Sequence, residues 1–141
     1  MPSADTPHRG CTAGVCDPQR TPGLQKPAPK GTHTLVELKG PGVFLGAEVL
    51  KQGGADDQTI SELTIDGRNL FTAPFASVEA IGLTGFNHAG VVLAPTTGPA
   101  KSMTLGFASP LRFDRSVVLS VDVQEDGVVS ILGNIWHGSA A

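Results

Sequence analysis

The sequence is poor in the residues that many binding proteins use for recognition. Aromatic side chains make up 5% of the 141 residues, with one tryptophan and no tyrosine. Sugar-binding β-sandwich modules stack glycans on exposed tryptophan and tyrosine rings, so the composition gives a glycan-binding role little support. The net charge of −3 argues against direct nucleic-acid binding, because phosphate contacts require a clustered basic surface.

Long apolar segments are also missing. No run reaches the length of about 18 apolar residues that a membrane-spanning helix needs. The first ten residues, MPSADTPHRG, lack the apolar stretch that is typical of a secretory signal. These absences predict a protein without a membrane partner that is made and kept in a cytosol, where disulfides are uncommon.

Catalytic motifs are scarce as well. There is no Gly-x-Ser-x-Gly nucleophile elbow, and GPGVFLG (40–46) opens a strand rather than the helix that would hold a phosphate. None of the four histidines is paired with another at metal-ligand spacing; they are His8, His33, His88 and His137. We therefore expect neither an enzyme nor a cofactor, with a small jelly-roll metalloenzyme as the weakest alternative.

Glycine and proline are plentiful instead, with 18 and 11 residues. They punctuate about eight short strands at spacings of roughly eight to twelve residues, the pattern of an all-β protein. The expected fold is a single antiparallel β-sandwich, jelly-roll-like, over residues 33–141. The segment FASVEAIGL (75–83) is expected to be one of its strands, after Pro74.

Residues 1–32 differ from this body. They are rich in proline, and Val15 and Leu24 are their only bulky aliphatic residues before Gly31. Such a segment cannot bury enough apolar area to fold alone, so we expect an extended N-terminal arm. Residues 1–42 carry five basic and three acidic side chains, and residues 43–141 carry five basic and ten acidic ones. The arm is therefore either a solvated tail or, as we favour, a segment that binds a neighbouring subunit.

Alternation is clearest in the last two strands. In RSVVLSVDV (115–123) four apolar residues share one face; they are Val117, Leu119, Val121 and Val123. In VVSILGNIWHG (128–138) the expected inward residues are Val129, Ile131 and Ile135. Leu132 and Trp136 then share the opposite face with polar residues, where they form either a second buried layer or an interface anchor. The candidate interface residues are Leu24, Val118, Leu132 and Trp136.

Two loops require attention. Asp56 and Asp57 in GGADDQ form either a calcium-binding loop or, as we favour, a turn in which acids and glycines suit the geometry. In LTGFNHAG (83–90) Phe86, Asn87 and His88 are a candidate ligand loop. A surface ligand- or glycan-binding module that uses this loop is the main alternative function; otherwise His88 is a strand-start histidine bonded to backbone.

Three stretches carry a resemblance: ISELTIDGRNLF (60–71), SPLRFDRSVVLSVDV (109–123) and VVSILGNIWHG (128–138). Together they resemble the small β-sandwich and jelly-roll proteins that decorate the virions of tailed phages. The resemblance implies a structural capsid decoration (cement) subunit at the virion surface, made in the host cytoplasm. It also implies a homo-oligomer, often a trimer, with an arm that reaches neighbouring capsid proteins. Cytoplasmic or extracellular assembly is the alternative location.

The two cysteines, Cys11 and Cys16, lie in the arm. Zinc would need His8 together with His33 or Asp17 to complete four ligands. Two free thiols are the second reading. The favoured one is a local disulfide, which stiffens the arm and, by closing so short a loop, constrains the unfolded chain by only about 2 kcal/mol.

Overall fold

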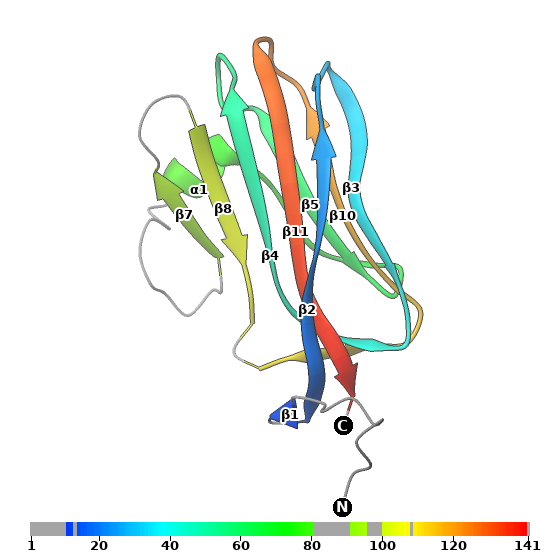
Figure 1. The fold of residues 1–141 in the computed structure, drawn as a ribbon. Helices are drawn as coiled ribbons and strands as arrows, with labels where there is room; N and C mark the ends of the chain where they lie inside the picture. The colour runs from blue at the N-terminus through cyan, green and yellow to red at the C-terminus, as the bar shows by residue number, and fades with distance from the viewer. Residues whose placement is uncertain (1–10, 13, 81–90, 96–99, 108, 141) are drawn as a thin grey trace, which may run out of the picture.

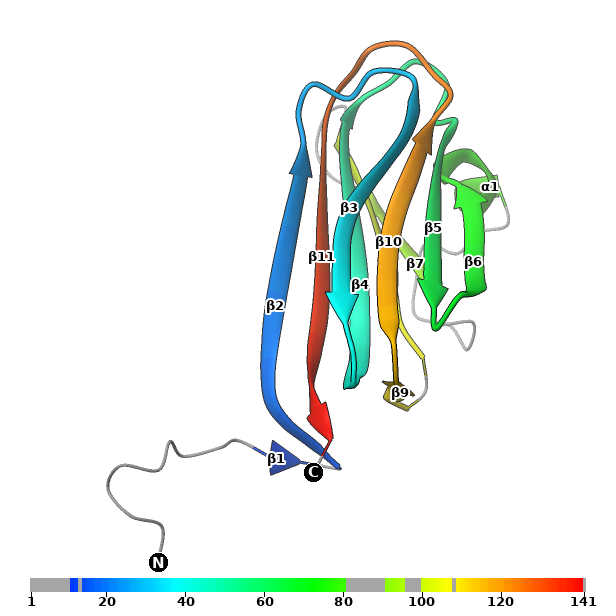
Figure 2. The same ribbon diagram turned by 90° about the vertical axis from the view of Figure 1, so that its right-hand side faces the viewer.

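The computed structural model describes residues 11, 12, 14–80, 91–95, 100–107 and 109–140. It is a β-sandwich of two antiparallel sheets, one of seven strands and one of four. The all-β prediction is therefore confirmed. Figure 2 shows the two layers, with β2 (Val15–Gln25) and β11 (Val128–Ala140) in one and β10 (Ser116–Val123), β5 (Thr59–Ile65) and β6 (Arg68–Pro74) in the other. The only helix among these residues is short, and none is long and apolar enough to cross a membrane.

The larger sheet has the order β1-β2-β11-β4-β8-β7, and β9 also pairs with β4. It contains β2, from the N-terminal part of the chain, side by side with β11, from the C-terminal part (Figure 1). The bounds are β1 Cys11–Thr12, β2 Val15–Gln25, β4 Gly42–Gly53, β7 Val91–Pro95, β8 Ala100–Leu105, β9 Leu111–Phe113 and β11 Val128–Ala140.

The smaller sheet has the order β3-β10-β5-β6. Its bounds are β3 Gly31–Lys39, β5 Thr59–Ile65, β6 Arg68–Pro74 and β10 Ser116–Val123. The turn between β5 and β6 is Asp66–Gly67, and both residues have positive φ, 51° and 78°. That is the conformation a two-residue type I′ hairpin turn requires, and it explains why Asp-Gly stands there.

The N-terminal region differs from the arm expected over residues 1–32. Residues 15–25 form β2, which pairs with β11 from Val15↔Ala140 to Gln25↔Ile131. The low aliphatic content does not prevent this pairing, because such a segment can still form backbone hydrogen bonds with a neighbouring strand. Pro18 and Pro22 fit there because β2 lies near the sheet edge, where β1 covers only its first two residues.

Residues 75–83 were expected to be a strand, and this prediction is wrong for the part that the structure describes. Phe75–Ala80 form the helix α1. Alanine and glutamate favour a helix, and the preceding Pro74 ends β6. The backbone N–H of Ala76 donates to the carbonyl of Asp57, 3.0 Å away, which satisfies one amide of the first turn.

The core fills the space between the sheets. The four predicted residues of β10 are all buried, at 1% exposure or less. Gly23 and Gly133 lie opposite each other in β2 and β11. A Cβ atom at Gly133 would lie 2.9 Å from the Leu35 side chain, so glycine lets the two sheets approach here. The largest fully buried side chains include Phe44, Phe75, Phe113, Leu63, Met103, Leu119, Ile131 and Ile135.

One inward prediction in β11 is wrong. Val129 is 54% exposed, and Val128 joins the core in its place. The pairing of β11 with β4 shifts between Val128 and Ser130, as in a β-bulge. A bulge inserts one residue into one strand, so every side chain before it changes face.

Candidate functional site

The outer face of the larger sheet carries a row of three leucines. Leu132 in the central strand β11 is paired with Leu24 of β2 on one side and with Leu50 of β4 on the other. Residues paired in this way point to the same side of a sheet, so the leucines form one apolar row across three strands. Leu24 is 63% exposed, and the other two are half-buried.

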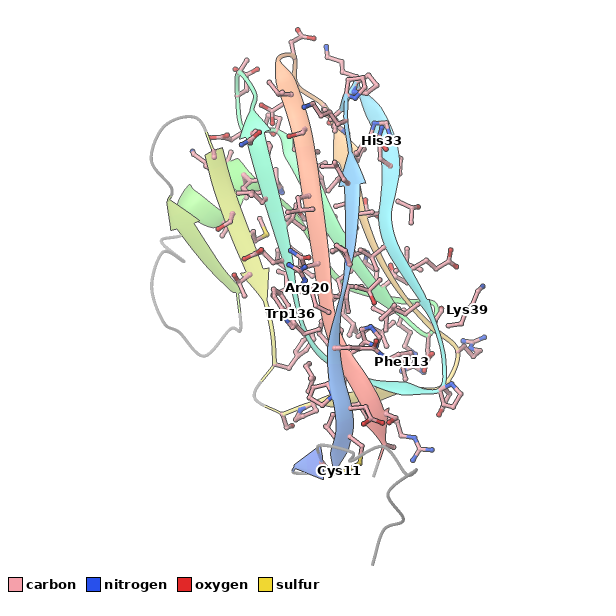
Figure 3. The ribbon with its side chains drawn as sticks, viewed as in Figure 1. Cys11, Arg20, His33, Lys39, Phe113 and Trp136 are labelled. Atoms are coloured by element: carbon pink, nitrogen blue, oxygen red, sulfur yellow. A yellow bond between two sulfur atoms is a disulfide. The ribbon has the colours of Figure 1, made fainter. Side chains whose placement is uncertain are left out.

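Trp136 continues this outer face along β11. It is paired with Arg20 of β2 and with Gly46 of β4, and Arg20 and Trp136 lie close together in Figure 3. Trp136 is 36% exposed, so its ring lies partly open beside a residue without a side chain. We call Leu24, Leu50, Leu132 and Trp136 the outer apolar face.

Asn134 lies on the same side, between the leucine row and Trp136. Its Nδ2 donates to Oε1 of Glu48 over 3.3 Å. The residue is only 3% exposed, and its Oδ1 accepts no hydrogen bond from any described residue. A buried acceptor without a donor is unfavourable in an isolated chain.

Val118, the fourth candidate interface residue, lies elsewhere. It is on the outer face of the smaller sheet, paired with Glu37 of β3 and Thr64 of β5. The structure thus brings three of the four candidates together and separates the fourth from them. The smaller sheet's outer face is polar around Val118, so that residue is the natural control for the outer apolar face.

A buried charge cluster, which sequence reasoning missed, lies between the sheets at one end. We define it as Lys51, Asp57, Lys101 and Glu125. The side chains of Lys51 and Glu125 are both 0% exposed, and Lys51 Nζ lies 3.0 Å from Glu125 Oε2. Lys51 Nζ also lies 2.6 Å from Asp57 Oδ1, and Lys101 binds Asp57 Oδ2. Two ammonium groups and two carboxylates give the cluster no net charge. This matters because an unpaired charge is costly to bury.

Glu125 is held by several donors. Oε1 accepts from the backbone amides of Asp56 and Asp57 at 3.2 and 3.1 Å, and Oε2 accepts from Thr59 Oγ1 at 2.7 Å. Burial raises the pKa of this carboxyl, but the bonds from Thr59 and Lys51 outweigh burial, and the pKa is lowered overall. The group is therefore an ionised carboxylate with a fixed orientation.

Asp57 is also ionised. Burial raises the pKa of Asp57. The hydrogen bonds from Lys101 and Lys51 lower it by more than burial raises it, so the pKa lies below its ordinary value. Its φ is +55°, a region that residues other than glycine seldom occupy. Asp56 and Asp57 lie in the loop between β4 and β5, and both carboxylate oxygens of Asp57 contact lysines. Across the described residues no three His, Cys, Asp or Glu side chains are grouped as metal ligands.

Lys51 carried a signal that could have identified the cluster. Ala47, Val49 and Lys51 alternate in β4, and all three are buried. The residues KQGG that follow Leu50 have the composition of a turn, which obscures this signal. The alternation of buried and outward residues in β4 extends from Val49 to Lys51, and this pattern predicts a lysine in the core.

The opposite end of the sandwich has a second bound carboxylate. Asp66 Oδ1 accepts from the amides of Arg115 and Ser116 at 2.7 and 3.1 Å, and Oδ2 accepts from the amide of Asp114 at 2.9 Å. These backbone hydrogen bonds lower the pKa of Asp66. The side chain ties the β5–β6 turn to the start of β10.

The cysteines are joined. Cys11 and Cys16 form a disulfide between β1 and β2. His33 lies at the other end of the molecule from Cys11 (Figure 3), with its Nε2 2.8 Å from the Pro29 carbonyl. It therefore does not complete a zinc site with the cysteines, and His8 lies outside the described residues.

His137 is the other histidine that the structure describes. His137 Nε2 lies 2.7 Å from Thr21 Oγ1, and burial lowers its pKa. The candidate ligand loop, with Phe86, Asn87 and His88, lies outside the described residues.

A scan against protein-family models found no match to the chain, and a search of curated proteins found none either.

Proposed function

We propose that this chain is a non-enzymatic assembly subunit that associates through its outer apolar face. The observation that carries the proposal is the leucine row, in which Leu24, Leu132 and Leu50 are in register across three strands. Interfaces are enriched in exposed apolar groups and tryptophan at their centre. Trp136 supplies such an anchor on the same face.

Two further features support association through the face rather than through the sheet edge. Asn134 Oδ1 is buried without a donor among the described residues, and a partner could supply one. At the edge, Pro18 and Pro22 lack the amide hydrogen that a further strand would need for its ladder. The edge strand β2 is therefore poorly suited to binding another strand.

The kind of assembly follows from the resemblance of the sequence. We infer a decoration subunit on a virion capsid, as a homo-oligomer with a trimer favoured and with a capsid protein as its partner. We propose that the predicted N-terminal arm contacts neighbouring subunits. An image of the native assembly that places the chain away from any capsid would reject this part of the proposal.

Light scattering during size-exclusion chromatography tests the face itself. We expect the wild-type chain to be an oligomer and Leu24→Glu/Leu132→Glu to be a monomer, because two charges would be desolvated in the interface. Val118→Glu on the smaller sheet is the matched control and should remain oligomeric. A monomeric wild type, or equal dissociation by the control, contradicts the proposal.

A further inference from the structure

We propose that the buried charge cluster forms an intramolecular isopeptide bond between Lys51 Nζ and Cγ of Asp57. This goes beyond the assembly function and concerns a covalent modification that the chain performs on itself. Lys51 Nζ donates a hydrogen bond to Asp57 Oδ1 over 2.6 Å, which places the amine next to the carboxyl group. Positioning at contact distance supplies much of the advantage of an intramolecular reaction.

Lys51 is suited to be the nucleophile. Its side chain is 0% exposed, and its ammonium group lies 5.2 Å from the centre of the Phe75 ring. Lys101 also contacts Asp57, but its side chain is 27% exposed.

Glu125 is placed to move the protons. Its Oε2 lies 3.0 Å from Lys51 Nζ, within hydrogen-bond reach of the proton that must leave. Thr59 and the amides of Asp56 and Asp57 hold both of its oxygens. A carboxylate fixed in this way can accept a proton from nitrogen and return it to a leaving oxygen.

Lys101 is the positioning cation. It binds Asp57 Oδ2, the oxygen that does not face Lys51. Negative charge would develop on that oxygen in the tetrahedral intermediate, and a fixed ammonium group stabilises it. Asp57 itself is held with φ +55°, and its carbonyl accepts from the amide of Ala76.

The step balances without any co-reactant. The reaction starts from the ion pair, since the pKa of Asp57 lies below its ordinary value. The Lys51 ammonium gives a proton to Glu125, and its nitrogen electron pair forms a bond to Cγ of Asp57. The C–Oδ1 bond breaks, and the oxygen leaves as water with the proton from Glu125 and a second one from nitrogen. Oδ2 becomes the amide oxygen, and Glu125 is a carboxylate again.

Intact-mass spectrometry of the full chain, after reduction of the Cys11–Cys16 disulfide, tests the proposal. We expect a mass lower than that of the sequence by one water, and a proteolytic fragment that joins Lys51 to Asp57. An unmodified wild-type mass overturns the proposal. A fragment that joins Lys101 to Asp57, or Lys51 to Glu125, overturns this assignment.

Variants sharpen the result. Lys51→Met and Glu125→Gln should both retain the full mass, whereas Asp57→Asn should lose ammonia instead of water. Lys39→Met is the matched control, because Lys39 pairs with Glu37 at 3.5 Å but is 83% exposed, and it should still lose water. Loss of water by Lys51→Met, or by Glu125→Gln, contradicts the roles assigned here.

Discussion

At each end of the sandwich a carboxylate connects loops through hydrogen bonds. The two carboxylates, Glu125 and Asp66, are in different surroundings. Glu125 follows β10, is fully buried and faces an equally buried lysine. Asp66 lies in the β5–β6 turn, beside the start of β10. Its carboxylate accepts hydrogen bonds from three backbone amides near solvent. In Figure 1 the turn after β10 lies at the top of the molecule, and the β5–β6 turn lies at the lower right.

The comparison separates two ways of holding a carboxylate. Backbone amides alone are sufficient for Asp66, because water solvates the rest of the group. The Glu125 side chain is fully buried, so its charge is matched by Lys51, and the equally buried Lys51 also pairs with Asp57. Removing one member of the buried cluster therefore disturbs several others, whereas Asp66 acts alone.

The largest effect is expected from Glu125→Ala. It removes the acceptor of Thr59 and of two amides, and it leaves Lys51 with one carboxylate in place of two. Breaking a buried ion pair typically costs about 3–5 kcal/mol of the free energy of unfolding. Urea unfolding followed by circular dichroism measures this loss.

The matched change at the other end is Asp66→Ala. It also removes three hydrogen bonds, but the amides that lose them are near solvent, and water can replace the carboxylate. We expect a smaller loss of unfolding free energy than for Glu125→Ala, under the same conditions. An equal or larger loss at Asp66 would show that burial does not determine the difference between the ends.

The sequence predicts the Asp66 end better than the Glu125 end. Asp-Gly between apolar runs is a local signal, so the turn at Asp66 and Gly67 could be predicted from neighbouring residues alone. The cluster depends on contacts between Lys51 and Glu125, which are 74 residues apart. No local pattern encodes such a pairing, although the alternation of β4 could have placed Lys51 inward.

The same distinction explains the other differences between sequence and structure. The alternation of β10 is regular, and its buried face was predicted correctly. In β11 a bulge changes which valine is buried, and a bulge leaves no mark in the residue pattern. Residues 15–25 are apolar-poor, and their place in the sheet comes from the ladder with β11.

A titration tests the Asp66 end by itself. Its pKa is lowered on folding from 3.8, so the unfolded chain binds the proton more tightly than the folded one does. Asp66→Asn should therefore be less stable than wild type above about pH 4, and the difference should shrink as the pH falls through the folded pKa. Urea unfolding of both chains over this range measures it; a difference independent of pH would show that the charge is not involved.

The smallest effect is expected from Cys11→Ser/Cys16→Ser, near the Asp66 end of the sandwich. The disulfide joins β1, a two-residue strand, to β2, and closing so short a loop constrains the unfolded chain by at most about 2 kcal/mol. Because β2 is held to β11 by pairs along its whole length, the double variant should keep the β-sandwich spectrum by circular dichroism. Assembly should weaken if the segment before β1 contacts a neighbour, which light scattering would detect as a lower oligomer mass. Loss of the β fold itself would mean that β1 and its disulfide hold the sheet, and not only the segment that precedes it.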